Sequence, residues 1–190
     1  MSGKGRPAAV VLLALGPVLA AAYAGAEYVG IRAAVRAQVA HPEWEGGRID
    51  ASGMTTTGAD SWRIAALVAL FAGLMSLAYL VIGLLLRRPR RGRTALLVIS
   101  GVLILPYALA FAVALLDPGR GLAALGDQVG FVEGLPAWQP YTAYLILIGG
   151  LAQAAGMVMA TADGRRAAAA RTAPADQESR PSLQRPGGGS

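Results

Sequence analysis

The sequence contains no cysteine and a single histidine, His41. Without cysteine, a disulfide scaffold, thiolate catalysis and cysteine-ligated metal or iron–sulfur centres are excluded. Charge is also scarce, because only 15% of the 190 residues are charged and 55% are hydrophobic, whereas a soluble domain carries about 25% charged residues. This composition excludes an ordinary soluble enzyme, a disordered protein and a coiled coil.

Four long apolar runs dominate what remains. They cover residues 8–28, 63–86, 94–116 and 141–162. Each meets the length of about 20 apolar residues that a helix needs to cross a bilayer. None alternates polar and apolar residues as a strand would, and a helix satisfies its own backbone hydrogen bonds in lipid. The sequence therefore predicts an all-α, polytopic membrane protein whose four antiparallel helices form a bundle.

The distribution of basic residues predicts the orientation of this bundle. Twelve of the 17 cations lie in the N-terminus, the 87–93 connection and the C-terminal tail, and cytoplasmic segments of membrane proteins are enriched in Lys and Arg. Both termini are therefore expected in the cytoplasm of a bacterial cell, with residues 1–7 and 163–190 inside. The strongest topogenic signal is RRPRRGR, which contains Arg87, Arg88, Arg90, Arg91 and Arg93. The same orientation puts Trp62, Trp138 and Tyr141 at the outer membrane interface, where aromatic rings are favoured.

Two segments have ambiguous ends. The basic start, apolar run and small residues of the first span also fit a cleaved secretory signal, although its length favours a retained span. The tail 163–190 is rich in Ala, Arg, Pro, Ser and Gly, and we expect it to be mostly disordered. Its first part can prolong the fourth helix through RRAAAAR.

Small residues at spacing four indicate how the spans pack, since close approach of helices in lipid depends on such residues. One ladder ends at Gly73 and another is centred on Gly156. Gln153 is the most polar side chain inside a span and is expected to form an interhelical hydrogen bond; a ligand contact is the alternative. Pro17 and Pro106 are expected to kink their helices. The three ladders are Gly16–Ala20–Ala24, Ala65–Ala69–Gly73 and Ala152–Gly156–Ala160.

Outside the apolar centres, Glu27 is the acidic residue closest to lipid. It is expected to be solvated or paired with Arg32, and a proton- or cation-accepting role is the alternative. His41 with the acids of the first outer loop matches no metal motif, and we expect no metal and no cofactor. The second outer loop is expected to form a short amphipathic helix over residues 122–131 on the outer surface.

The composition and the four-span plan around RRPRRGR resemble those of small, Ala- and Arg-rich membrane proteins of high-GC actinobacteria that have no assigned activity. The resemblance supplies no functional residue, and the sequence shows no nucleotide-binding or hydrolase motif. The leading hypothesis is a non-enzymatic structural or interaction component of the cell membrane, with the lipid bilayer and a membrane protein or a second copy as partners. The alternative is a small-solute transporter or its subunit. The basic excess is explained by topology, so nucleic acid is not an expected partner.

Overall fold

The computed structural model describes residues 5–44, 46–86, 93–125 and 130–172, and these contain helices but no strand. This confirms the predicted all-α fold. The elements in chain order are α1 (Gly5–Ala40), α2 (Thr56–Leu86), α3 (Arg93–Val102), α4 (Ile104–Leu115), α5 (Pro118–Leu125), the 3-10 helix η1 (Gln139–Thr142) and α6 (Ala143–Thr172).

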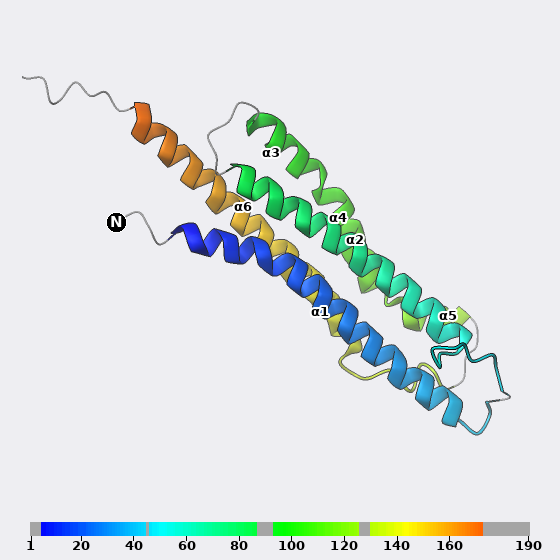
Figure 1. Cartoon of the computed structure of the whole chain (residues 1–190). Helices are drawn as coiled ribbons and strands as arrows, with labels where there is room; N and C mark the ends of the chain where they lie inside the picture. Colours follow the sequence, from blue (N-terminus) through cyan, green and yellow to red (C-terminus); the bar gives the residue numbers. More distant parts are fainter. Residues whose placement is uncertain (1–4, 45, 87–92, 126–129, 173–190) are drawn as a thin grey trace, which may run out of the picture.

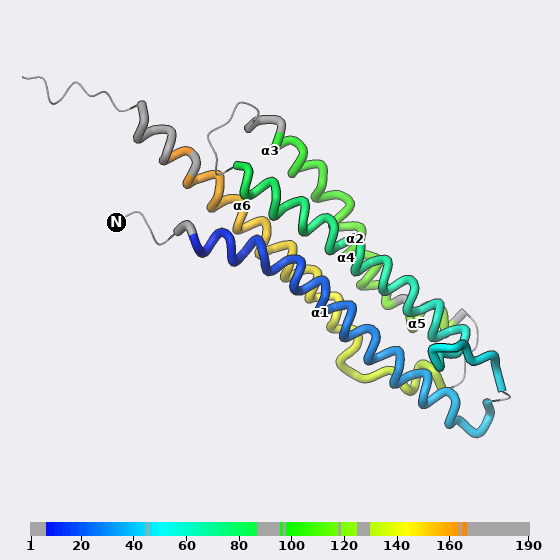
Figure 2. The backbone as a smooth tube through the Cα atoms, in the orientation of Figure 1, coloured from blue at the N-terminus to red at the C-terminus, as the bar shows by residue number. Residues whose placement is uncertain are grey.

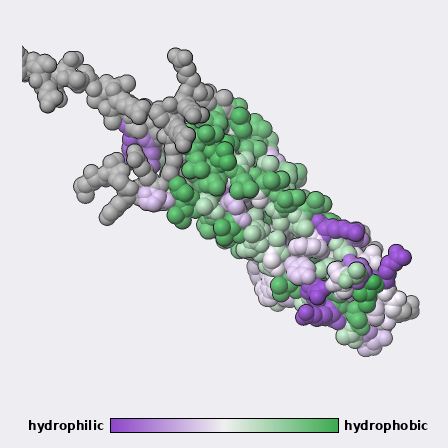
Figure 3. Space-filling view, in the orientation of Figure 1, coloured by the Kyte–Doolittle hydropathy of each residue, from purple (hydrophilic) through white to green (hydrophobic). Residues whose placement is uncertain are grey.

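Four of these helical stretches are long and apolar enough to cross a membrane: Pro7–Ala40, Thr56–Leu86, Val98–Leu115 and Gln139–Asp163. Their outward surfaces carry large apolar side chains, such as Leu105, which is 75% exposed. Figure 3 shows a broad apolar belt, with hydrophilic residues towards both ends of the molecule. A surface of this kind is stable only against lipid or another apolar partner, so the four-span prediction is confirmed.

The spans run antiparallel, and α1 begins at the same end of the bundle at which α6 finishes (Figure 1). We call this the terminal end and the opposite one the loop end. Helix α6 continues to Thr172, so the first part of the tail is helical; residues 173–190 lie outside the described part. Arg87, Arg88, Arg90 and Arg91 also lie outside it, whereas Arg93 begins α3.

The third span is made of two helices in succession, α3 and α4, with Leu103 between them (Figure 2). Pro106 explains the break. Proline has no N–H to donate to the carbonyl four residues earlier, and its ring crowds that carbonyl. Here the carbonyl belongs to Val102, the last residue of α3. The predicted kink in this span therefore takes the form of an interrupted helix.

Helix α1 extends well beyond lipid, since 36 residues at about 1.5 Å each exceed the roughly 30 Å of a hydrocarbon core. Its last turns pack into an apolar cluster at the loop end, in which Phe131 is fully buried. A short helix does form in this loop, but it is α5, Pro118–Leu125, and the expected surface position of residues 122–131 is wrong, because Ala123 and Phe131 are buried. The cluster, here the loop-end cap, comprises Ile31, Ala34, Val35, Ala65, Ala123, Phe131 and Leu135, with Trp62 against it.

The first loop is ordered around one aspartate. The Asp50 carboxylate accepts hydrogen bonds from the Ser52 hydroxyl at 2.6 Å, the Ser52 amide at 2.8 Å and the Met54 amide at 3.0 Å. These donors favour the ionised carboxylate, so they hold the pKa of Asp50 below its usual value. The turn thereby fixes the chain just before α2 begins.

Candidate functional site

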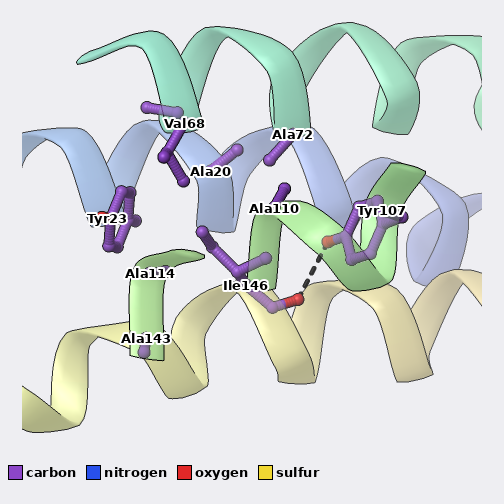
Figure 4. Packing of buried hydrophobic residues seen from close by; sticks show 10 residues of the cluster. Ala20, Tyr23, Val68, Ala72, Tyr107, Ala110, Ala114, Ala143 and Ile146 are labelled. Carbon is purple, nitrogen blue, oxygen red and sulfur yellow. Dashed lines mark hydrogen bonds between the residues drawn. The ribbon is translucent and has the colours of Figure 1, made fainter. Parts of the chain in front are cut away.

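The centre of the bundle is an apolar cluster of small side chains and two tyrosines. Ala20, Ala72 and Ala110 come from three different spans and are buried together (Figure 4). The Tyr107 hydroxyl donates a hydrogen bond of 2.8 Å to the Ile146 carbonyl, which ties α4 to α6. Small residues thus allow close helix approach, and a buried hydroxyl adds an interhelical bond.

Gln153 joins three helices at the middle of the bundle. Its side chain is 1% exposed, and its Nε2 donates to the Leu13 carbonyl of α1 at 3.2 Å and to the Ser76 carbonyl of α2 at 2.8 Å. Both amide hydrogens are therefore used between backbone carbonyls. Its Oε1 is buried and accepts no hydrogen bond from the described residues.

The sequence of α1 explains why Gln153 binds there. Pro17 has no N–H, so the Leu13 carbonyl four residues earlier lacks its helical donor, and the Gln153 amide takes that place. Gly16 provides the space, because a Cβ on Gly16 would lie 2.3 Å from the Gln153 amide. Pro17, Gly16 and Gln153 thus form one unit, which we call the Gln153 junction.

The two glycines singled out from the ladders behave differently. A Cβ on Gly156 would lie 2.9 Å from Leu13 Cγ and 3.2 Å from the Ala9 carbonyl oxygen, so α6 touches the backbone of α1 here. A Cβ on Gly73 would meet only Ala20 Cβ, at 3.9 Å. Gly156 therefore lies at a close helix contact, whereas Gly73 lies at an ordinary one.

A groove of about 450 Å³ lies between the third span and α6. Ile104, Tyr107, Leu151, Gln153 and Val158 are among the residues that line it. Three of these, Ile104, Leu151 and Val158, are at least 60% exposed, so the groove opens towards the lipid. We call it the α4–α6 groove; its wall is apolar except for tyrosine, serine and glutamine groups.

At the loop end, Glu27 does not occupy the environment expected from the sequence. It is only 4% exposed. It accepts a hydrogen bond from Gln139 Nε2 at 3.0 Å and contacts the Thr142 hydroxyl. The expected pairing with Arg32 is wrong, because residues five apart in a helix do not share a face. Arg32 instead donates to the Ser52 carbonyl at 2.7 Å.

Gln139 is the central residue of this polar cluster, which sequence reasoning missed. Its Nε2 also donates to Asp117 Oδ1 at 3.0 Å, and Arg120 forms an ion pair of 3.1 Å with the other oxygen of Asp117. We call Glu27, Asp117, Gln139 and Thr142 the loop-end polar cluster. Its members come from three separate parts of the chain, with only Gln139 and Thr142 close in sequence. The one available signal was therefore the inward direction of Glu27, which lies four residues after Tyr23 in the same helix.

The remaining sequence candidates do not assemble into a site. His41 accepts a hydrogen bond from the Glu43 amide at 3.3 Å, and within the described ranges no three His, Asp or Glu side chains gather as metal ligands would. The aromatic residues expected at the interface, Trp62, Trp138 and Tyr141, lie near the loop end. There the Tyr28 and Trp62 rings meet edge to face at 5.1 Å. No protein-family model, curated protein or solved structure matches the chain.

Proposed function

We propose that this chain is a non-enzymatic interaction component of the bacterial plasma membrane, with both termini cytoplasmic, which receives a transmembrane helix of a partner protein in the α4–α6 groove. The groove is the observation that carries this proposal. It lies at the depth of the spans, opens sideways and has an apolar wall. These are the properties of a surface that a second helix covers.

The loose packing of the third span supports the same proposal. In the most apolar 18-residue stretch of this span, only 17% is buried within the protein, whereas the corresponding stretches of the other three spans are 28% to 33% buried. Gln153 also lines the groove, but its side chain is only 1% exposed, so an incoming helix would meet the apolar side chains around it.

A small-solute transporter is the second candidate, and the volume of the groove is the observation that favours it. The Gln153 amide hydrogens, however, both bind backbone carbonyls. The polar atoms at this depth therefore hold helices together rather than line a passage. This use of Gln153 supports an interaction role over transport.

The proposed orientation predicts the labelling of single cysteines, which the cysteine-free chain makes simple to read. Ser52→Cys at the loop end should react with a membrane-impermeant maleimide in intact cells. Arg166→Cys at the terminal end should react only after the membrane is permeabilised. The reverse pattern would place the termini outside and contradict the positive-inside assignment.

Occupation of the groove predicts a position-dependent photocrosslink. A photoreactive residue at Leu151, on the groove and 62% exposed, should give a protein adduct of one defined size in cells. Val18 is a matched control, since it is 61% exposed near the middle of α1 and should give lipid adducts only. Peptides of this chain in the adduct would identify a second copy as the partner. Lipid adducts alone at both positions would refute the proposal.

A further inference from the structure

The buried carboxyl group of Glu27 faces an unusual set of neighbours. Its Oε1 contacts the Thr142 hydroxyl, and that hydroxyl lies 2.7 Å from the Gln139 backbone carbonyl. A carbonyl accepts hydrogen bonds and never donates, and a threonine hydroxyl has one hydrogen. If that hydrogen goes to the carbonyl, the contact between Glu27 and Thr142 needs a hydrogen on Glu27.

The charges around Glu27 lead to the same conclusion. Asp117 shares the Gln139 amide with it and is itself paired with Arg120. Arg32 binds the Ser52 carbonyl, and Arg63 pairs with Asp60 on the exposed side of α2. No cation among the described residues forms an ion pair with Glu27. A buried carboxylate without a counter-charge is costly, and the group takes up a proton instead.

Two further buried polar atoms near Glu27 are unused, one a donor and one an acceptor. The Tyr23 side chain is fully buried one turn before Glu27, and its hydroxyl has no hydrogen-bond partner within the described part of the chain. The Gln139 Oε1 is also buried without a donor, and as an acceptor it suits the protonated form of Glu27 and not the carboxylate. With these unused groups beside it, Glu27 has more than one possible arrangement of hydrogen bonds. A contact that served only to hold the helices together would need a single arrangement.

We propose that Glu27 is a proton-binding site at the loop end of the bundle, which carries its proton while α1 is packed against η1. The chain of hydrogen bonds then runs from Glu27 to Thr142 and on to the Gln139 carbonyl. Loss of the proton places a negative charge beside Asp117 and weakens the contact between α1 and η1. In the folded protein Glu27 is protonated near neutral pH, whereas in the unfolded chain it is ionised. The folded state therefore binds one more proton than the unfolded state, and the free energy of unfolding falls as the pH rises. The inference is independent of what fills the α4–α6 groove.

Infrared spectroscopy of the full-length chain in lipid nanodiscs tests this directly. At neutral pH we expect a band from a protonated carboxyl group that disappears in Glu27→Gln. Glu133→Gln makes the same chemical change at an exposed glutamate and should retain the band. On raising the pH, the wild-type band should be lost and the thermal midpoint should fall. Glu27→Gln keeps a neutral, hydrogen-bonding side chain and should hold its midpoint constant.

Thr142→Val provides a second reading that leaves Glu27 in place. It removes the acceptor of the Glu27 proton, so the carboxyl band should remain and shift in frequency. Absence of the band in the wild type at neutral pH would overturn the proposal. So would stabilisation of the wild type by sodium or calcium that Glu27→Gln abolishes, because the compensating ion would then be a metal cation.

Discussion

Gly156→Ala is expected to lower the free energy of unfolding by about 1–3 kcal/mol, the usual cost of overpacking a close contact. The new Cβ would lie 2.9 Å from Leu13 Cγ and 3.2 Å from both the Leu13 nitrogen and the Ala9 oxygen. Two of these are backbone atoms, which cannot turn aside as a flexible side chain does. Helix α6 must therefore move away from α1, the helix against which it packs most extensively.

Gly73→Ala is the matched control, because it adds the same methyl group in the same lipid environment and meets only Ala20 Cβ at 3.9 Å. Its stability should stay within about 0.5 kcal/mol of the wild type, as for substitutions without a specific contact. Unfolding of both variants by sodium dodecyl sulfate in mixed micelles, followed by circular dichroism, measures the difference. Equal losses in the two variants would show that α1 and α6 are not in close contact at Gly156.

The sequence was sufficient for the four helices because each property that defines a span is local. A run of apolar residues of sufficient length has one stable structure in lipid. Pro106 was likewise readable as a disturbance of the third span. That the helix stops at Val102 and resumes at Ile104 required the backbone, because a proline in a membrane helix bends or interrupts it according to its neighbours.

The hydrogen-bond partners within the sites were harder to predict from the sequence, because they depend on pairs of residues far apart in the chain. Gln153 was recognisable as a polar group that needs a partner, but its partners are backbone carbonyls of Leu13 and Ser76. Every residue has a carbonyl, so sequence identity does not mark the one that is used. Glu27 was assigned to solvent or to a pair with Arg32 from its position near the end of an apolar run. The actual helix continues to Ala40, and Ile31, Ala34 and Val35 of its last turns pack into the loop-end cap.

The Gln153 junction makes a quantitative prediction through a double-mutant cycle. Gln153→Leu should lower the free energy of unfolding by about 1–2 kcal/mol, because the Leu13 carbonyl then has no donor in a lipid-surrounded core. Pro17→Ala restores the N–H that a helix normally donates to that carbonyl. In the Pro17→Ala background, Gln153→Leu should therefore cost less than half as much, since the Ser76 carbonyl lies within an uninterrupted helix.

Pro106→Ala is the control for this cycle, because it also replaces a proline inside a span, but the N–H that it restores is directed to the carbonyl of Val102, which Gln153 does not contact. Its effect should add to that of Gln153→Leu, as expected for independent sites. Coupling to Pro17 but not to Pro106 identifies the Leu13 carbonyl as the reason why a glutamine lies at this depth. Equal coupling to both prolines would instead assign Gln153 a general role in packing.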